Sequence, residues 1–177
     1  MDGLIVLLSS ITLAVLFLFL LFNFVIALLA IIIREKKYIK YQPSVSIVIP
    51  TFNEEKNITY CLESIAALEY PNDKIEVIIV DDGSSDNTVK IAEEYGIKAI
   101  KQKHLGKVEA LNNGIKNSKH EFVLTLDADT SIEKDCLKNI IMPFSENDVG
   151  ATNGTLKLRN WKDSILTIFQ KVEYDYN

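Results

Sequence analysis

The sequence predicts an α/β domain, with a mostly parallel sheet flanked by helices, preceded by one N-terminal transmembrane helix. Three observations lead to this fold class. From residue 45 onward, short runs of β-branched and apolar residues alternate with segments whose apolar residues recur at helical spacing. Several of these runs end directly in acidic residues, at the place where an open α/β sheet binds its ligands. The third observation is a long uncharged segment at the start of the chain.

The uncharged segment covers residues 3–33, which exceeds the roughly 20 apolar residues that a helix needs to cross a bilayer. It is too long for the apolar part of a signal peptide, and no basic residue precedes it. A basic cluster follows at residues 34–40, whereas only Asp2 lies on the other side. Because basic residues stay on the cytoplasmic side, we expect a single-pass protein of the cell membrane with a cytoplasmic C-terminal domain. Residues 1–40 are then the membrane helix and juxtamembrane segment, and residues 41–177 the α/β domain.

The first elements of this domain are a strand, a helix and a second strand. Residues 45–49 are almost all β-branched and apolar, as in a strand buried on both faces, and Pro50 is expected to end it. Thr51 or Asn53 is expected to cap the following helix. Apolar residues at helical spacing then place one face of that helix on the sheet: Ile58, Cys61, Leu62, Ile65 and Leu68. Residues 75–80 form the second strand.

The remaining elements continue the alternation. Residues 84–86 open a helix that reaches about residue 95, and residues 97–100 form a short third strand. A basic loop with Gly106 then leads into a helix, and residues 122–126 form the fourth strand. The apolar residues of these last two helical segments are Val108, Leu111 and Ile115, followed after the fourth strand by Leu137, Ile140, Ile141 and Phe144. A fifth strand is expected near residues 149–158, and a helical segment at residues 161–176.

Composition excludes two classes of function. The formal net charge is −5, and the basic residues outside the juxtamembrane cluster are scattered, so nucleic acid is not expected as a partner. Cys61 and Cys136 stand apart without the spacing of a metal site, so we expect both to be reduced packing residues.

Asp127 and Asp129 follow the fourth strand and are separated only by the small residue Ala128. On an extended chain these two carboxylates would point the same way, and like charges this close repel unless a cation lies beside them. Hard carboxylate oxygens suit Mg²⁺ or Mn²⁺, ions that usually bind substrate phosphates as well. An Asp-x-Asp pair also occurs in ordinary acidic loops, so this motif alone leaves both interpretations open.

Polar residues follow two other strands, at positions 52–54 and at Asp81 and Asp82. Lys107, preceded by Gly106 at a helix N-terminus, could supply the positive charge that a phosphate needs. Together these residues suggest a nucleotide diphosphate bridged by a divalent metal. Simpler interpretations remain for residues in these loops. Lys107 could be an ordinary surface lysine, Asp86 a helix cap, and His104 a solvent-exposed loop histidine.

Four segments in order resemble the family 2 glycosyltransferases. They are VSIVIPTFNEE at residues 45–55, VDDGSSD at 80–86, GKVEALNNG at 106–114 and LDADT at 126–130. The resemblance covers residues 41–176 and is closest to the membrane-bound processive branch, which includes cellulose, chitin, hyaluronan and poly-N-acetylglucosamine synthases. It implies a GT-A, Rossmann-like fold and an inverting transfer of a sugar from a nucleotide sugar, with UDP as the expected nucleotide, to a polysaccharide or lipid acceptor.

The resemblance also implies roles for individual residues. Pro50, Phe52 and Glu54 match positions that line the nucleoside pocket. Asp82, alone or with Asp81, matches the acid that contacts the base, and Lys107 matches a lysine that reaches the diphosphate. Asp127 matches the acid near the ribose and the metal, and Asp129 matches the metal ligand, with Mg²⁺ or Mn²⁺ as the cofactor.

The chain departs from the family pattern in its last part. The family's general base, usually in a Thr-Glu-Asp motif, and the Gln-x-x-Arg-Trp motif of processive members are both absent. No catalytic residue is therefore assigned, and the domain is expected to be incomplete on its acceptor side. The alternative hypothesis is a catalytically silent, truncated or split chain that binds the donor nucleotide or a complementary membrane chain. A nucleotidyltransferase is a weaker alternative, because residues 50–55 read PTFNEE rather than a glycine-rich basic loop.

Overall fold

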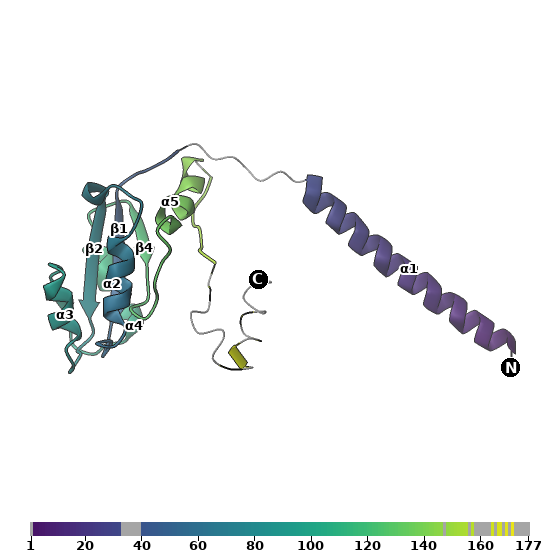
Figure 1. Ribbon diagram of the computed structural model, residues 1–177, viewed down its shortest axis with the longest axis horizontal. Helices are drawn as coiled ribbons and strands as arrows, with labels where there is room; N and C mark the ends of the chain where they lie inside the picture. Colours follow the sequence, from purple (N-terminus) through teal and green to yellow (C-terminus); the bar gives the residue numbers. More distant parts are fainter. Residues whose placement is uncertain are drawn as a thin grey trace. The chain divides into compact units, whose positions relative to one another are not determined.

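The computed structural model describes residues 2–32, 40–146, 148–155, 157, 164, 166, 167, 169 and 171. The chain divides into two compact units, residues 1–37 and residues 38–177 (Figure 1).

The first unit contains one long helix, α1 (Asp2–Ile32). Its segment Gly3–Leu29 has 27 residues with a mean hydropathy of 2.9, so it could cross a membrane by length and composition. Polar side chains within it bond back to carbonyls of the preceding turn: the Asn23 side-chain amide donates to the Phe19 carbonyl at 2.8 Å. The Thr12 hydroxyl donates in the same way to the Leu8 carbonyl. These side chains therefore satisfy a hydrogen bond within their own helix.

The second unit is built on a parallel sheet of four strands in the order β3-β2-β1-β4. The strands are β1 (Val45–Thr51), β2 (Ile75–Asp81), β3 (Ile100–Lys101) and β4 (Phe122–Thr125). All seven residues of β1 are buried, which explains why its sequence is nearly continuous in β-branched and apolar residues. Because β2 and β4 lie on opposite sides of β1, the strand order reverses there, and the carboxyl ends of β1 and β4 border a crevice.

Helices cover both faces of the sheet. On one face, α2 (Ile58–Ala66), α3 (Thr88–Glu94) and α5 (Cys136–Ile141) contribute buried residues to the core cluster that contains β1 residues Ile47 and Ile49. On the other face, α4 (Lys107–Lys116) packs against Val48 and Val80, as the ribbon shows with α4 behind the sheet (Figure 1). Two short 3₁₀ turns, η1 (Asn72–Lys74) and η2 (Met142–Ser145), complete the described elements. The predicted α/β class with a parallel sheet and a candidate membrane helix is confirmed.

The helix α4 contacts the sheet through its small residues. Ala110 and Gly114 are buried, and a Cβ at Gly114 would collide with Val48 and approach Val80 Cγ2 to 3.1 Å. Of the three larger apolar residues that marked this helix in the sequence, Leu111 is partly buried against the core, whereas Val108 and Ile115 turn outward and are 70% and 45% exposed. Small residues therefore bring α4 close to the sheet.

Several predicted boundaries were wrong. Pro50 lies within β1 rather than ending it, paired in register with Val80. The helix after β1 begins at Ile58 instead of near Asn53, because the chain first makes a turn with Asn53 at a positive φ of 55°.

Other boundaries shift in the same way. The next helix begins at Thr88 rather than at residues 84–86, and β3 is only Ile100–Lys101 rather than residues 97–100. Residues 149–155 contain no strand, which contradicts the predicted fifth strand over its described part. Most of residues 161–176 lie outside the described residues.

Pro50 fits a central strand because of the side it faces. Backbone groups of successive strand residues point to alternate sides, so Pro50 faces the same side as Val48, toward β4. The Val48 carbonyl accepts a hydrogen bond from the Leu126 N–H at 3.0 Å, and the β1–β4 pairing ends with Val48 and Thr125. At the level of Pro50 the strands have separated, so the proline leaves no ladder bond unmade.

Candidate functional site

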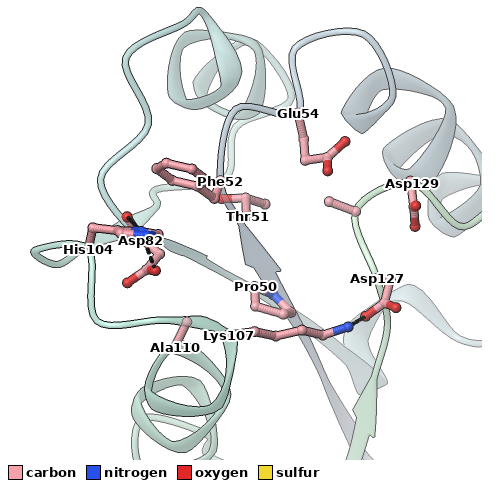
Figure 2. Close-up of a pocket in the computed structure, with 11 residues that line it drawn as sticks. Pro50, Thr51, Phe52, Glu54, Asp82, His104, Lys107, Ala110, Asp127 and Asp129 are labelled. Atoms are coloured by element: carbon pink, nitrogen blue, oxygen red, sulfur yellow. Dashed lines mark hydrogen bonds and ion pairs between the residues drawn. The ribbon is translucent and has the colours of Figure 1, made fainter.

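A cavity of about 280 Å³ lies at the carboxyl ends of β1 and β4, where the crevice is expected (Figure 2). Residues from β1, from the loops after β1, β2, β3 and β4, and from α4 line it. They are Pro50, Thr51, Phe52, Glu54, Asp82, His104, Lys107, Ala110, Asp127, Ala128 and Asp129. The structure therefore brings together all the predicted site residues except Asp81.

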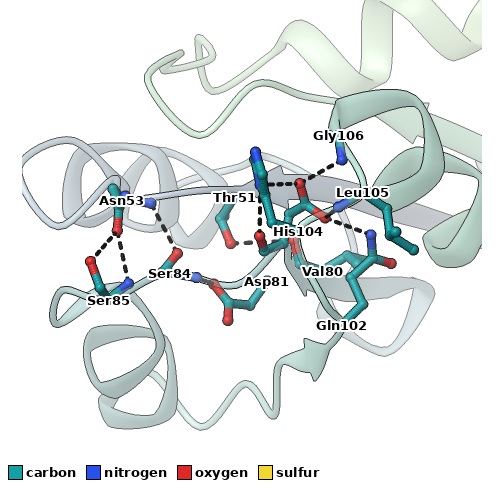
Figure 3. Close-up of polar contacts among 11 residues, drawn as sticks. Thr51, Asn53, Val80, Asp81, Ser84, Ser85, Gln102, His104, Leu105 and Gly106 are labelled. Carbon is teal, nitrogen blue, oxygen red and sulfur yellow. Dashed lines mark hydrogen bonds and ion pairs between the residues drawn. The ribbon is translucent and has the colours of Figure 1, made fainter.

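Asp81 has a structural contact instead. Its Oδ1 accepts a hydrogen bond from the Ser84 N–H at 3.1 Å, which stabilises the turn after β2 (Figure 3). The side chain is buried and does not line the cavity.

The loops after β1 and β2 are bound to each other by reciprocal hydrogen bonds (Figure 3). The Asn53 N–H donates to Ser84 Oγ at 2.9 Å, and the Ser85 N–H donates to Asn53 Oδ1 at 2.9 Å. The positive φ of Asn53, which asparagine tolerates better than most residues, permits this exchange. It fixes the turn that carries Phe52 and Glu54 into the cavity.

Asp86 extends this connection between the two loops. Its Oδ1 accepts the N–H of Thr88, the first residue of α3, at 3.0 Å. Its Oδ2 accepts the Glu55 N–H at 3.1 Å. Asp86 therefore bonds to the start of α3, as the cap interpretation expects, and also to the loop after β1.

Asp82 organises the loop after β3. Its buried carboxylate accepts hydrogen bonds from the Gln102 side-chain amide at 2.7 Å and from the Leu105 and Gly106 N–H groups at 2.9 and 2.8 Å. His104 Nδ1 lies 2.9 Å from its Oδ2. Burial alone would raise the pKa of Asp82, but these hydrogen bonds and the nearby His104 lower it below its ordinary value. The carboxylate is therefore held ionised.

The loop histidine His104 is solvent-exposed, as expected, with 60% of its side chain accessible, and it also lines the cavity. The His104 ring stacks on Phe52, with 4.2 Å between ring centroids and 28° between planes. Phe52 and His104 thus form an aromatic end of the cavity beside Asp82 (Figure 2). Sequence reasoning missed His104 because its position depends on contacts with residues from two other loops. Its place in a loop just before the GKVEALNNG segment was the available signal.

The opposite side of the cavity is charged (Figure 2). Lys107 Nζ lies 2.7 Å from Asp127 Oδ1, and both side chains are more than half exposed. Asp129 follows in a tight turn closed by the Thr130 N–H, which donates to the Asp127 carbonyl at 3.0 Å. Asp127 and Asp129 therefore lie in a turn and not on an extended chain, the condition under which their carboxylates would point the same way, and both line the cavity.

Two carboxylates at one end of a cavity fit a divalent ion that is shared with a ligand. Among the described residues, no group of three or more His, Cys, Asp or Glu side chains is placed to bind a metal. Mg²⁺ commonly takes only one or two carboxylates from a protein and completes its coordination with substrate phosphates and water. Asp127 and Asp129 match that donor set.

Cys61 lies beneath this turn, with its Sγ 3.8 Å from the Asp127 carbonyl oxygen. Burial and the nearby Asp129 and Asp127 raise the pKa of its thiol to about 12. The thiol therefore stays protonated and acts as a packing group.

Comparison with known proteins connects this cavity to a family. Residues 46–171 match the family model described as Glycosyl transferase family 2. A poly-beta-1,6-N-acetyl-D-glucosamine synthase of Staphylococcus epidermidis is 40% identical over 136 residues, covering 73% of this chain and 32% of that protein. The Staphylococcus aureus (strain COL) synthase of the same name is 37% identical over 138 residues, with the same coverage. The chain thus spans about a third of the length of these relatives.

Solved structures are also similar to this chain. The mannosyltransferase PcManGT from Pyrobaculum calidifontis, in complex with GDP-Man and Mn²⁺, superposes with a TM-score of 0.61 at 28% identity, covering 66% of this chain and 38% of that one. S. aureus TarS 1-349 in complex with UDP-GlcNAc gives a TM-score of 0.52 at 29% identity, covering 66% and 41%. The family match, which spans most of the chain and includes every residue that lines the cavity, confirms the resemblance seen in the four motifs: the chain belongs to glycosyl transferase family 2.

Proposed function

We propose that this chain binds a nucleotide-diphosphate sugar in the cavity, with UDP as the nucleotide, and takes part in transferring the sugar to a polysaccharide or lipid acceptor. The observation that supports the proposal is the difference between the two ends of the cavity: stacked aromatic rings lie at one end, and a lysine with two aspartates lies at the other. A nucleotide sugar has its chemical groups in the same arrangement, with a flat base at one end and a charged diphosphate next to the sugar.

The aromatic end suits the nucleoside. Phe52 offers a ring that is 44% exposed, and Pro50 and Glu54 come from the same strand end and turn. TarS binds UDP-GlcNAc, which supports a uridine nucleotide for a member of the same family.

The charged end suits the diphosphate and a metal ion. Lys107 would contact the phosphates, and Asp127 and Asp129 would hold Mg²⁺ or Mn²⁺. A bound ion supplies Lewis-acid neutralisation of the charge that develops on the departing diphosphate. The complex of PcManGT contains Mn²⁺, which supports this choice of ion.

An inverting transfer also needs a base that takes the proton of the acceptor hydroxyl. We assign no described residue to that role. Asp82 is already committed to hydrogen bonds, and Glu54 Oε2 accepts a hydrogen bond from the Asn57 side-chain amide at 2.9 Å. Asp127 and Asp129 are assigned to the metal.

The apolar helix α1 and the basic residues after it support a location at the membrane. We propose that α1 spans the membrane once and that the α/β domain lies on the cytoplasmic side, where nucleotide sugars are made. The relatives named as polysaccharide synthases support an acceptor that is a growing sugar chain.

Titration calorimetry of the full chain in detergent tests this proposal. UDP should bind in the presence of Mn²⁺, with at least about tenfold weaker binding without the ion, because the carboxylates then repel the diphosphate. Asp129→Ala should abolish the effect of Mn²⁺. Asp73→Ala, which removes an exposed aspartate in η1 remote from the cavity lining, should leave it unchanged.

A folded wild-type chain that binds no UDP with Mn²⁺ would refute the proposal. UDP binding without any sugar transfer by the purified chain would favour the alternative, in which the chain binds the donor and depends on a complementary chain for transfer.

A further inference from the structure

The helix α4 keeps apolar side chains in contact with solvent on its outer face. Val108 and Ile115 are 70% and 45% exposed, and they lie two turns apart, which puts them on the same side of a helix. Leu111 lies between them on that side and is partly buried. The residues that α4 buries completely against the sheet are the small ones, Ala110 and Gly114. The outer face of α4 is therefore an apolar stripe that the described part of the chain leaves largely uncovered.

Leu105 adds a further exposed apolar side chain in the loop just before α4. Its side chain is 64% exposed, although its N–H is fixed by a hydrogen bond to Asp82 Oδ1 at 2.9 Å. The N–H of the next residue, Gly106, donates to the same carboxylate at 2.8 Å (Figure 3). The loop is therefore held in place while it presents a large apolar side chain to water. Neighbouring exposed apolar side chains of this kind mark an interaction surface.

Positive charge borders this stripe. The six lysines of residues 98–120 are accompanied by a single acidic residue, Glu109, in a chain whose net charge is −5. Two of these lysines form ion pairs with carboxylates of other elements. Lys103 in the loop and Lys116 at the end of α4 are exposed and form no ion pair with the described part of the chain. Unpaired cations therefore lie near both ends of the apolar stripe.

An anionic lipid surface suits an apolar stripe bordered by lysines. Helices that lie on membranes insert apolar side chains at the headgroup level, while their lysines are attracted to anionic lipids. The remainder of the chain is net acidic, so the same lipids would repel other faces of the domain.

The membrane helix would keep the domain close to such a surface. α1 ends at Ile32 and the described part of the domain begins at Lys40, so the chain between them extends at most about 30 Å. With α1 in the bilayer, this tether would give the domain a high effective concentration at the lipid surface.

We propose that the outer face of α4, together with the loop before it, docks on the anionic surface of the membrane that α1 spans. This inference rests on the proposed location of the domain at the membrane. Leu105, Val108 and Ile115 would insert among the lipid headgroups, and Lys103 and Lys116 would contact lipid phosphates. Three apolar side chains give only weak, reversible binding, so the docking depends on α1 and is lost from a domain without it.

Quenching of tryptophan fluorescence by lipids with brominated acyl chains tests this contact in the full chain, reconstituted in nanodiscs. A Trp161→Phe background removes the only tryptophan of the chain. In this background, Val108→Trp should lose at least about a third of its emission in discs of brominated phosphatidylcholine and phosphatidylglycerol, because an interfacial helix buries its apolar face about 5–10 Å into the boundary of the acyl chains. Brominated phosphatidylcholine alone should quench it at most about half as strongly, since the lysines then face no anionic lipid.

Variants on α3 and on α4 provide the controls. Glu93→Trp, at an exposed position of α3 on the other face of the sheet, should not be quenched in either kind of disc. Lys116→Glu reverses one charge of the docking face and should weaken the docking by at least about tenfold, which lowers the quenching of Val108→Trp to the level in neutral discs. Lys90→Glu makes the same change at an exposed position of α3 and should leave the quenching unchanged. The thermal unfolding midpoint of each variant shows whether it has folded.

Unquenched Val108→Trp emission in a folded chain that binds UDP with Mn²⁺ would overturn this inference and leave the proposed function intact. Emission that shifts to shorter wavelength without quenching would also overturn it, because protein rather than lipid would then cover α4. Quenching that Lys116→Glu leaves unchanged would refute the selection of anionic lipid. A quenched chain that binds no UDP would instead refute the proposed function, so the two failures are distinguishable.

Discussion

Glu76 on β2 shows how a single carboxylate ties separate segments of the domain together. Its Oε2 accepts hydrogen bonds from the Ser46 hydroxyl at 2.7 Å and from the Lys119 N–H at 3.0 Å. Its Oε1 lies 2.7 Å from Lys119 Nζ. Burial would raise the pKa of Glu76, but the hydrogen bonds from Lys119 and Ser46 outweigh it and lower the pKa from 4.5 to about 2. Since the folded pKa lies below the unfolded one, ionised Glu76 stabilises the fold above pH 4.5, and this contribution is lost as the pH falls toward 2.

We therefore expect Glu76→Gln to lower the free energy of unfolding by about 1–2 kcal/mol at pH 7. The difference from wild type should shrink as the pH falls from 4.5 to 2. Urea unfolding of the full chain across this pH range measures both effects. Glu93→Gln, at an exposed position of α3, is the matched control and should change stability little. A difference between Glu76→Gln and wild type that stays constant down to about pH 2.5 would contradict this explanation.

At the residue scale, the sequence predicted positions better than roles. Acidic and aromatic residues at strand ends could be recognised because parallel strands bring their carboxyl ends together, and this placed Phe52, Asp82 and Asp129 correctly around one cavity. The roles of His104 and Asp81 depend on turns that no periodic pattern encodes. Whether a side chain in such a loop faces the cavity or the turn is decided by hydrogen bonds that the loop sequence alone does not reveal.

At the scale of elements, α4 is the clearest case in which the buried residues differ from those that the hydrophobic pattern of the sequence marks. Hydrophobic periodicity indicates a helix at this place, and the helix is present. The same periodicity marked Val108, Leu111 and Ile115 as the apolar residues, but only Leu111 packs against the core, and the fully buried contact is made by Ala110 and Gly114. Close packing favours small residues, which hydrophobicity alone does not distinguish from surface residues.

Gly114→Ala tests this close contact. Alanine favours a helix over glycine by about 1 kcal/mol, but its Cβ would collide with the Val48 side chain. We expect a net loss of about 1–3 kcal/mol in the free energy of unfolding, as is typical of overpacked cores. Asn112→Ala, at an exposed position of the same helix, should be neutral or slightly stabilising. Urea unfolding measures the free energy of unfolding of both variants. If Gly114→Ala is more stable than wild type, α4 can move away from the sheet at little cost.

The strands β1, β2 and β4 were predicted more reliably than the helix starts. Runs such as residues 45–49 and 75–80 are rich in β-branched and apolar residues and largely buried, so their composition alone identifies them. Helix starts shifted by several residues because the loops after β1 and β2 bond to each other before either helix begins. That exchange links residues 31 and 32 positions apart and has no local signature.

At the scale of the whole molecule, a strongly apolar helix is joined to a domain whose cavity is polar. We expect the full chain expressed in bacteria to stay with the membrane fraction after an alkaline wash, because burying an apolar helix of 27 residues in lipid is strongly favourable. Deletion of residues 2–32 should release the domain into the soluble fraction. Retention of the shortened chain would show that the domain itself binds the membrane.

Orientation can be measured with the same preparations. Protease added to inverted membrane vesicles should digest the α/β domain, whereas protease added to intact spheroplasts should leave it whole. The basic residues 34–40 set this expectation. Digestion in spheroplasts would place the domain outside the cell and would be incompatible with a supply of cytoplasmic nucleotide sugar.

Pro50 in the central strand has a consequence for how the cavity attracts anions. Many phosphate sites use main-chain N–H groups as fixed partial positive charges. Here the strand end beside the cavity contributes a residue that has no N–H to offer. In the proposed complex, attraction of a diphosphate would then depend on Lys107, which is paired with Asp127 in this structure, and on a bound cation. The affinity of this domain for its donor would therefore follow the supply of divalent ions in the cell, with the backbone of β1 supplying shape but no charge.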